Sequence, residues 1–378
     1  MSIYSCRVCD NKFLEKPLIH YDNMPKAAQN FPDLDLLNCE KSVDLTVCQC
    51  SGCGLVQLSN DPVPYYREVI RAASVSDVVK NIKTEQFSNF IQKYSLQGRK
   101  LIDIGCGRGE FLSLLQPFDI YAIGLEYSES SVAECIKKGL NASKGYFDSE
   151  VNVLPKGPFD AFLLHMFLEH MPDPNSALKG IYNNLADGAV GIVEVPNFDM
   201  VLRNKLFSEF IGDHLLYFSK DTLQTTMNIN GFEIIECTEL RDEYVLSAVV
   251  KKREKVDVSR FHDYQIKITM ELENYISRFK ENRVAIWGAG HQALAILALT
   301  KIKNKIKCVL DSAPFKQGKY TPATHLPIVA PDVLAAGQID AVIIMAAAYS
   351  DEVATIIRKQ YSSNIFVAIL RDYGLEMI

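Results

Sequence analysis

The chain has 378 residues, of which 48% are apolar and 23% are charged, and its formal net charge is -6. This profile is that of a folded protein of two or three domains and excludes a disordered or fibrous chain. Charges of both signs are interspersed without a basic run, so we expect no nucleic-acid partner. No apolar stretch reaches about 18 residues and the first residues lack a secretion signal, so we expect a cytoplasmic protein without a membrane partner.

Cysteines are crowded at the start of the chain, where six of the ten fall within the first 53 residues. Two C-x-x-C pairs can together surround one tetrahedral zinc ion, and these are Cys6 with Cys9 and Cys50 with Cys53. Cys39 and Cys48 could compete as ligands, but Cys48 lies too close to Cys50 to share its geometry and fits a core position better. We therefore predict a structural zinc module over residues 1–62.

Alternating strand-like and helical segments follow. Residues 63–95 are predicted to be a helical linker, because 75–94 have the spacing of an amphipathic helix. Over 96–251, helical runs separate strand-like runs such as KLIDIGC, YAIGLEY, FDAFLLH and AVGIVEVP, which predicts a parallel sheet wrapped by helices. A long amphipathic helix over 252–281 bridges to a second, smaller doubly wound α/β domain over 282–378.

A glycine turn follows the first strand of the middle region. It reads D-I-G-C-G-R-G, with Asp103, Gly105, Gly107 and Gly109 in a G-x-G-x-G pattern that differs from the G-x-G-x-x-G of dinucleotide sites. S-adenosylmethionine has no phosphate, so its amino acid end and ribose would lie over such a turn. Glu126, 17 residues beyond Gly109, fits the acid that holds the ribose hydroxyls. The pattern favours S-adenosylmethionine, with a structural tight turn as the alternative.

The stretch PFDAFLLHMFLEHMPDP over residues 158–174 strengthens this interpretation. Together with the glycine turn and the later acid, it resembles class I S-adenosylmethionine-dependent methyltransferases. The resemblance implies that His165, at the end of an apolar strand, lines the cofactor, with a packed core histidine as the alternative. We expect Glu169 and His170 to hold a loop more than to do chemistry, and Asp148 to face the adenine amine.

The order of segments along nearly the whole chain resembles the nucleotide-sugar C-methyltransferases. It comprises the cysteine module, the class I core, EVPN at 194–197, DHLLYFS at 213–219 and VLDSAPFKQGKYTPATHLPI at 309–328. The resemblance implies a 4-keto sugar on a nucleoside diphosphate as the methyl acceptor. A base removes the proton beside the ketone, and the enolate carbon takes the methyl group. The resemblance implies that His214 is the base, with a histidine packed near the end of a helix as the alternative, and that Asp213 orients the site or contacts a sugar hydroxyl.

The chain also departs from this family. The family commonly has Y-H-E-H where residues 211–214 read I-G-D-H, so a donor that would stabilise the enolate is missing. The tyrosines that follow the zinc module in the family are only partly echoed by Tyr65 and Tyr66. Tyr217 and Ser219 are expected to be a packing residue and a helix cap. The acceptor and the atom methylated therefore stay open.

A second glycine turn, GAGHQA over 288–293, matches the dinucleotide pattern, and Asp311 lies 21 residues beyond Gly290. Taken alone, it would suggest a nicotinamide site, and a purely structural turn is a further alternative. The family resemblance implies that this domain holds the nucleotide part of the substrate, with phosphates at the backbone donors of the turn. The substrate-binding candidates are Gly288, Gly290, His291 and Lys316, although a lysine in this setting is more often a solvated surface residue.

The predicted function is therefore S-adenosylmethionine-dependent methylation of a nucleotide-activated keto-deoxysugar by a monomer or weak homo-oligomer. Three alternatives remain. They are an O- or N-methyltransferase on a nucleotide sugar or related metabolite, a non-catalytic nucleotide-sugar-binding protein, and a nicotinamide-dependent reductase, which the G-x-G-x-G turn disfavours.

Overall fold

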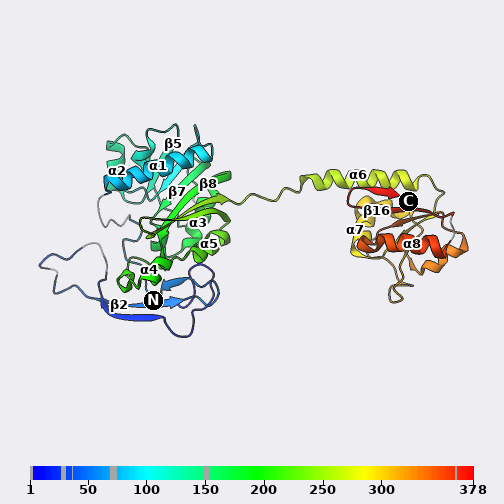
Figure 1. Ribbon diagram of the computed structural model, residues 1–378, viewed down its shortest axis with the longest axis horizontal. Helices are drawn as coiled ribbons and strands as arrows, with labels where there is room; N and C mark the ends of the chain where they lie inside the picture. Colours follow the sequence, from blue (N-terminus) through cyan, green and yellow to red (C-terminus); the bar gives the residue numbers. More distant parts are fainter. Residues whose placement is uncertain (1–2, 27–30, 36, 69–74, 149–152, 362–363) are drawn as a thin grey trace. The chain divides into compact units, whose positions relative to one another are not determined.

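The computed structural model describes residues 3–26, 31–35, 37–68, 75–148, 153–361 and 364–378. The chain divides into two compact units, Met1–Glu254 and Lys255–Ile378 (Figure 1). Each unit is built on its own main sheet and has its own hydrophobic core. The predicted zinc module and the middle region share the first unit.

A small antiparallel sheet opens the first unit. Its strands, in spatial order, are β1 (Ile19–Met24), β2 (Val43–Gln49), β3 (Val56–Leu58) and β9 (Leu216–Tyr217). The last of these comes from far along the chain, with Val56 opposite Tyr217. The cysteine-rich module is therefore joined to the middle region by backbone hydrogen bonds.

The main sheet of the first unit has seven strands in the order β10-β11-β8-β7-β4-β5-β6. Their bounds are β4 (Lys100–Ile104), β5 (Tyr121–Glu126), β6 (Ala142–Lys144), β7 (Phe159–His165), β8 (Leu185–Pro196), β10 (Phe232–Leu240) and β11 (Val245–Lys252). Strands β4 to β8 pair in parallel, as predicted. β10 and β11 are antiparallel, because the short connection 241–244 cannot carry a parallel crossover. The chain order reverses at β4, which is where open sheets bind their ligands.

Helices cover both faces of this sheet (Figure 1). They are α1 (Asp77–Lys93), α2 (Glu129–Lys137), α3 (Pro174–Asn183), α4 (Phe198–Asn204) and α5 (Lys220–Ile229). Side chains alternate along β4, so Leu101 packs with Phe87 of α1 while Ile102 lies in the core that α3, α5 and the cysteine module share. Tyr217 is buried and Ser219 caps α5, both as predicted.

The second unit is a smaller α/β domain with the sheet order β14-β13-β12-β15-β16-β17. Its strands are β12 (Val284–Trp287), β13 (Cys308–Leu310), β14 (Ile328–Val329), β15 (Ala341–Ile344), β16 (Phe366–Leu370) and the antiparallel β17 (Leu375–Met377). Its helices are α6 (Ser259–Ile276), α7 (His291–Thr300) and α8 (Ser350–Gln360). Ile268 and Leu272 of α6 pack in the core of this unit, so the long helix is part of it.

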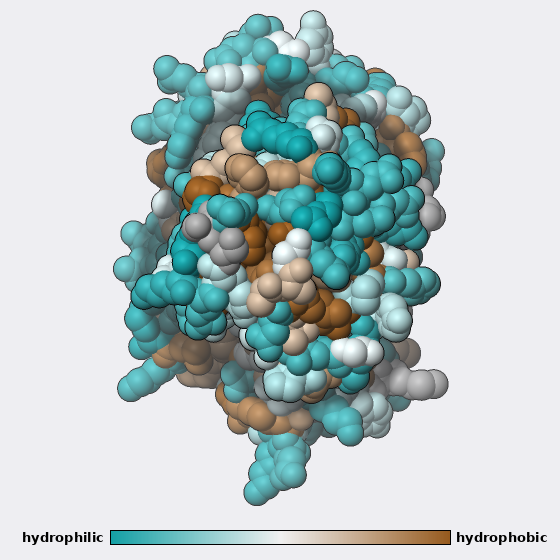
Figure 2. Space-filling view, turned by 90° about the vertical axis from the view of Figure 1, so that its right-hand side faces the viewer, coloured by the Kyte–Doolittle hydropathy of each residue, from teal (hydrophilic) through white to brown (hydrophobic). Residues whose placement is uncertain are grey.

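Short 3-10 helices complete the described chain. They are η1 (Leu112–Leu115), η2 (Leu168–His170), η3 (Phe207–Glu209), η4 (Ile302–Lys305), η5 (Pro331–Ala336) and η6 (Ala347–Tyr349). Figure 2 shows one face of the molecule, where hydrophobic residues form patches among hydrophilic ones. None of the helices in the described part of the chain combines the length and apolar character needed to cross a bilayer.

Candidate active site and cysteine cluster

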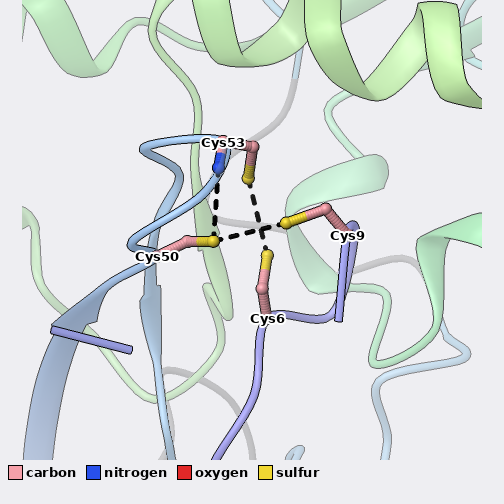
Figure 3. A group of neighbouring side chains, drawn as sticks. All are labelled: Cys6, Cys9, Cys50 and Cys53. Carbon is pink, nitrogen blue, oxygen red and sulfur yellow. Dashed lines mark hydrogen bonds between the residues drawn. The ribbon is translucent and has the colours of Figure 1, made fainter. Parts of the chain in front are cut away.

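Four cysteine side chains converge on one point in the first unit (Figure 3). Their sulfur atoms all lie within 4.8 Å of one another, and the Sγ atoms of Cys9 and Cys50 are 3.3 Å apart. Tetrahedral zinc with Zn–S bonds of about 2.3 Å places its sulfurs about 3.8 Å apart, so the cluster fits this ion. Cys48 is buried and Cys39 is exposed, and neither belongs to the cluster.

The two C-x-x-C loops have the same backbone geometry. Cys6 N–H donates to Asn11 O at 2.9 Å, and Cys50 N–H donates to Leu55 O at 3.0 Å. Backbone N–H groups also point at the thiols, with Val8 N 3.4 Å from Cys6 Sγ. Such donors stabilise thiolate charge, which is what metal ligands in this arrangement require.

The first glycine turn lies at the carboxyl end of β4. Gly109 has φ +81°, and a Cβ atom there would meet Leu140 Cδ1 at 2.3 Å, so only glycine fits. Glu126, at the end of β5, is 1% exposed and accepts the Gly107 N–H at 2.9 Å through Oε2. Its Oε1 accepts the Ser128 N–H at 2.8 Å. Glu126 therefore fixes the shape of the turn with the same carboxylate that the sequence analysis assigned to the ribose.

Two buried acceptors beside this turn have no hydrogen-bond partner within the described structure. They are Asp103 Oδ2 and His165 Nε2. Burial, followed by nearby Glu110, raises the pKa of Asp103 to about 7. Burial, followed by Lys83, lowers the pKa of His165, so its ring is neutral. A ligand with N–H donors, such as the ammonium group of S-adenosylmethionine, would satisfy both atoms.

His165 is held by a buried polar network that the sequence analysis did not find. Its Nδ1 donates to Glu194 Oε2 at 3.0 Å, which leaves Nε2 as the free acceptor. Lys83 of α1 is 1% exposed and contacts the same carboxylate oxygen of Glu194. Gln86 Nε2 and Ser247 Oγ each donate to Glu194 Oε1 at 2.9 Å. Burial alone would raise the pKa of Glu194, but His165 and Lys83 hold it well below its ordinary value.

Aromatic side chains and Arg67 surround the outer part of the cofactor region. The Arg67 guanidinium carbon lies 5.8 Å from the ring centre of Tyr127 and 5.6 Å from that of Tyr146. Arg67 also lies 3.7 Å from Asp148 Oδ2, and it lines one pocket with Gly105. Asp148 is half-exposed at this edge. The sequence analysis missed Arg67, because a single arginine outside any motif gives no signal.

His214 lies in the loop between η3 and β9. It lines a small pocket with Pro196, Phe198, Val201, Glu209 and Tyr217. Burial, followed by the neighbouring His170, lowers the pKa of His214 to about 3, so the ring is neutral near pH 7. Asp213 accepts the Tyr65 hydroxyl at 2.7 Å, so the tyrosine that follows the cysteine module reaches this site.

Glu169 and His170, just beyond β7, hold the His214 loop, as predicted. Leu215 N–H donates to the Glu169 carbonyl oxygen at 2.8 Å. His170 Nδ1 lies 2.7 Å from the Asp213 carbonyl oxygen, which can only accept, so this nitrogen carries the proton. The rings of His170 and His214 have centres 4.8 Å apart. The 3-10 helix η2, which follows β7, thus positions the His214 loop.

The second glycine turn lies in the other unit, between β12 and α7. Gly288 has φ +118°, and a Cβ atom would meet Met345 O at 2.6 Å. Asp311 accepts the Ala289 N–H at 2.8 Å and Lys316 Nζ at 2.9 Å, so Lys316 is engaged within the domain. Gly290 has open space around it, and His291 is exposed at the first position of α7.

Comparisons with known protein families match two segments that follow one another along the chain. Residues 80–237 match the family model of a methyltransferase domain, and residues 249–368 match that of the C-methyltransferase C-terminal domain. The chain therefore resembles C-methyltransferases over most of its length. It is an S-adenosylmethionine-dependent methyltransferase of the class I α/β fold, as the sequence analysis predicted.

Individual proteins resemble different lengths of the chain. The C-methyltransferase NovU of Streptomyces niveus is 22% identical over 93% of this methyltransferase and 91% of its own length. The ubiquinone biosynthesis O-methyltransferase of Methylococcus capsulatus is 34% identical, but over only 24% of this chain and 40% of its own. Among solved structures, magnesium protoporphyrin IX methyltransferase of Synechocystis has a TM-score of 0.38 and 15% identity over 48% of this chain and 90% of its own.

Proposed function

We propose that this methyltransferase adds a methyl group to the carbon beside the ketone of a nucleotide-linked keto-deoxysugar, with His214 as the base. The proposal rests on one observation above all. His214 is neutral and partly buried, and its loop is held to η2, which follows β7, the strand whose last residue, His165, lies beside the glycine turn. A proton acceptor and a cofactor pocket on one strand end are what methylation of a carbon acid needs.

The residues of the first unit would have separate roles in cofactor binding and in proton transfer. S-adenosylmethionine would supply an electrophilic methyl group. Asp103 and His165 would bind its ammonium group, and Glu126 would bind its ribose while holding Gly107. His214 would take the proton beside the ketone, leaving the electron pair on the sugar carbon as an enolate. Asp213, fixed by Tyr65, would hold the loop or contact a sugar hydroxyl.

In the second unit, we propose that the turn over 288–291 binds a nucleotide. Gly290 leaves open space at the start of α7, where backbone N–H groups favour phosphate. The Lys316–Asp311 pair lies beside this turn, through the bond from Ala289 N–H to Asp311. The lysine would have to leave Asp311 in order to contact a phosphate.

Deuterium exchange tests the carbon chemistry. The protein, S-adenosylhomocysteine and a thymidine-diphosphate 4-keto sugar in deuterated water should exchange the proton beside the ketone, and S-adenosylmethionine should give a C-methylated product. Turnover of the reduced sugar without a ketone would identify an O-methyltransferase instead. Absence of exchange and product with every 4-keto nucleotide sugar tested would refute the proposal.

Substitution of Glu126 with glutamine should weaken S-adenosylhomocysteine binding by about 10- to 100-fold. A charged acceptor contributes about 1.5–3 kcal/mol, and the variant loses its charge at both the ribose and the Gly107 N–H. Isothermal calorimetry measures the affinity. Glu129→Gln, at an exposed residue paired with Lys144, is the matched control and should bind as the wild type does. An unchanged affinity in the Glu126 variant would remove it from the site.

We also propose that the four-cysteine cluster holds one structural zinc ion. Substitution of Cys9 with serine should release the metal and lower the Tm by about 10 °C. This shift corresponds to a loss of about 3 kcal/mol in the free energy of unfolding, which is a modest value for a structural zinc site. Metal analysis of the purified protein and thermal unfolding measure both effects. The exposed Cys39→Ser variant should keep its zinc. A wild-type protein purified without metal, with the Tm of the Cys9 variant unchanged, would contradict this assignment.

A further inference from the structure

The surroundings of His214 pose a problem for a base. The ring is partly buried beside a second imidazole, so a positive charge there would lack part of the solvation that water provides. A histidine in such a place takes up a proton poorly unless a negative charge lies close by. The charge that would balance it has to come from the residues around the two rings.

Glu169 is the candidate that the geometry offers. Its side chain is fully buried, and neither of its carboxylate oxygens has a hydrogen-bond partner within the described structure. Its Oε1 lies 3.8 Å from His170 Nε2. Ligating atoms of Glu169, His170 and His214 all lie within 4.8 Å of one another. A buried carboxyl group without partners is costly, so this position calls for a function.

The hydrogen-bond pattern of His170 fixes the direction of the contact. Its Nδ1 donates to the Asp213 carbonyl oxygen, so Nε2 carries a lone pair and faces Glu169. Neutral His170 can therefore accept a hydrogen from a protonated Glu169 or from the ring of His214. His170 thus lies close to both the acid and the proposed base.

The other ionisable groups at this place are already engaged. Asp213 accepts the Tyr65 hydroxyl at 2.7 Å, and Glu209 accepts the Tyr244 hydroxyl at 2.9 Å. Burial, followed by the bond to Glu209, raises the pKa of Tyr244, so its hydroxyl stays neutral. Tyr217 is likewise kept neutral by a pKa that burial raises. The carboxyl group of Glu169 is left to supply the missing charge.

We propose that ionised Glu169, whose carboxylate lies within 4.8 Å of a ring nitrogen of each histidine, balances the charge of His214 while His214 holds the proton of the substrate. The inference rests on the proposed role of His214. In the step, the C–H bond beside the ketone breaks, its electron pair stays on the carbon, and the proton moves to a nitrogen of His214. Glu169 remains a carboxylate, so the side-chain cluster ends neutral and not positive. Glu169 is thus a positioning residue for the base.

A dependence on pH follows. Burial raises the pKa of Glu169 to about 8, so the carboxyl group is largely protonated near pH 7. The ionised form, which the proposal requires, becomes populated as the pH rises through this value. The rate of exchange beside the ketone should therefore rise with pH over the same range.

The test compares the wild type with Glu169→Gln in two measurements. In protein labelled with carbon-13 in histidine, the resonances of His170 and His214 should shift together near pH 8 in the wild type and not in the variant. With a thymidine-diphosphate 4-keto sugar in deuterated water, the variant should exchange at least about tenfold more slowly at high pH, with a flat pH profile. Glu169→Asp, which keeps the charge, should restore the pH dependence in part.

Controls separate this role from folding. The bond from Leu215 N–H to the carbonyl oxygen of Glu169 uses the backbone, so glutamine preserves it, and binding of S-adenosylhomocysteine should be unchanged. Glu236→Gln makes the same change at an exposed residue paired with Lys93 and should behave as the wild type does.

Two results would overturn the inference. In the first, the histidine resonances and the exchange rate depend on pH in Glu169→Gln as they do in the wild type. The other is exchange that EDTA abolishes and a divalent cation restores, because Glu169 would then be a metal ligand. Exchange that persists in His214→Asn would instead refute the proposed base, so the two failures are distinguishable.

Discussion

Replacement of His214 with asparagine should abolish methyl transfer while leaving S-adenosylhomocysteine binding intact. Removal of a positioned general base lowers rates by about 100- to 10,000-fold. Asparagine fills similar space in the pocket of Phe198, Val201 and Tyr217 but cannot take up a proton. The cofactor pocket should be unaffected, because Asp103, Glu126 and their contacts belong to other strand ends.

Deuterium exchange, product formation and calorimetry measure this result on one preparation. His20→Asn, at an exposed histidine of β1 bonded to Thr46, is the matched control and should retain full activity. Wild-type rates in the His214 variant would remove this residue from the mechanism. Loss of both activity and cofactor binding would point to a structural role.

The second large effect is on stability. Replacement of Lys83 with methionine should lower the free energy of unfolding by about 3–5 kcal/mol, because it removes one partner of a buried ion pair. Lys83 and Glu194 are 1% and 2% exposed, so water cannot replace the lost contact. His165, Gln86 and Ser247 would still contact Glu194, but the carboxylate would lose its only cationic partner among the described contacts.

Urea denaturation as a function of pH checks this prediction. The pKa of Glu194 lies well below its ordinary value of 4.5 in the folded state, so its stabilisation is present above pH 4.5 and is lost as the pH falls. The wild type should therefore lose its advantage over the Lys83 variant in acid. The double variant Lys83→Met with Glu194→Gln should recover part of the stability at neutral pH.

Lys80→Met provides the control one turn earlier in α1. Lys80 is exposed and, among the described residues, pairs with the exposed Asp77 on the same helix, so its loss should change little. Equal stability of the Lys83 variant and the wild type would show that the buried pair contributes nothing.

The alternating segments were enough to predict both α/β units. Runs such as FDAFLLH became the buried strand β7, and residues 75–94 became α1. Strand direction at the sheet edge was not predictable from hydrophobicity, because the pattern of apolar and polar residues in β10 and β11 does not depend on which way the strands run. The two-residue strand β9 was also missed, since its partner β3 lies far away in the sequence.

The site was predictable where glycine or cysteine spacing carries the signal. The structure brings together the four cysteines, and it places Glu126 against the glycine turn. The roles of Lys83 and Arg67 could not be predicted from the sequence. A lysine on an amphipathic helix or an arginine in a linker is expected to be exposed to solvent. Glu169 was visible in the sequence, but its lack of a hydrogen-bond partner is a property of the packed chain.

The pairing of β3 with β9 links the cysteine cluster to the histidine loop. Leu58 N–H donates to Leu215 O at 2.9 Å, one residue from His214, and β3 begins three residues after Cys53. An ion that never meets the sugar would thus fix where the proton acceptor stands. In a cell short of zinc, the protein would still bind the methyl donor but would not transfer the methyl group. The rate of methyl transfer would then depend on the supply of zinc.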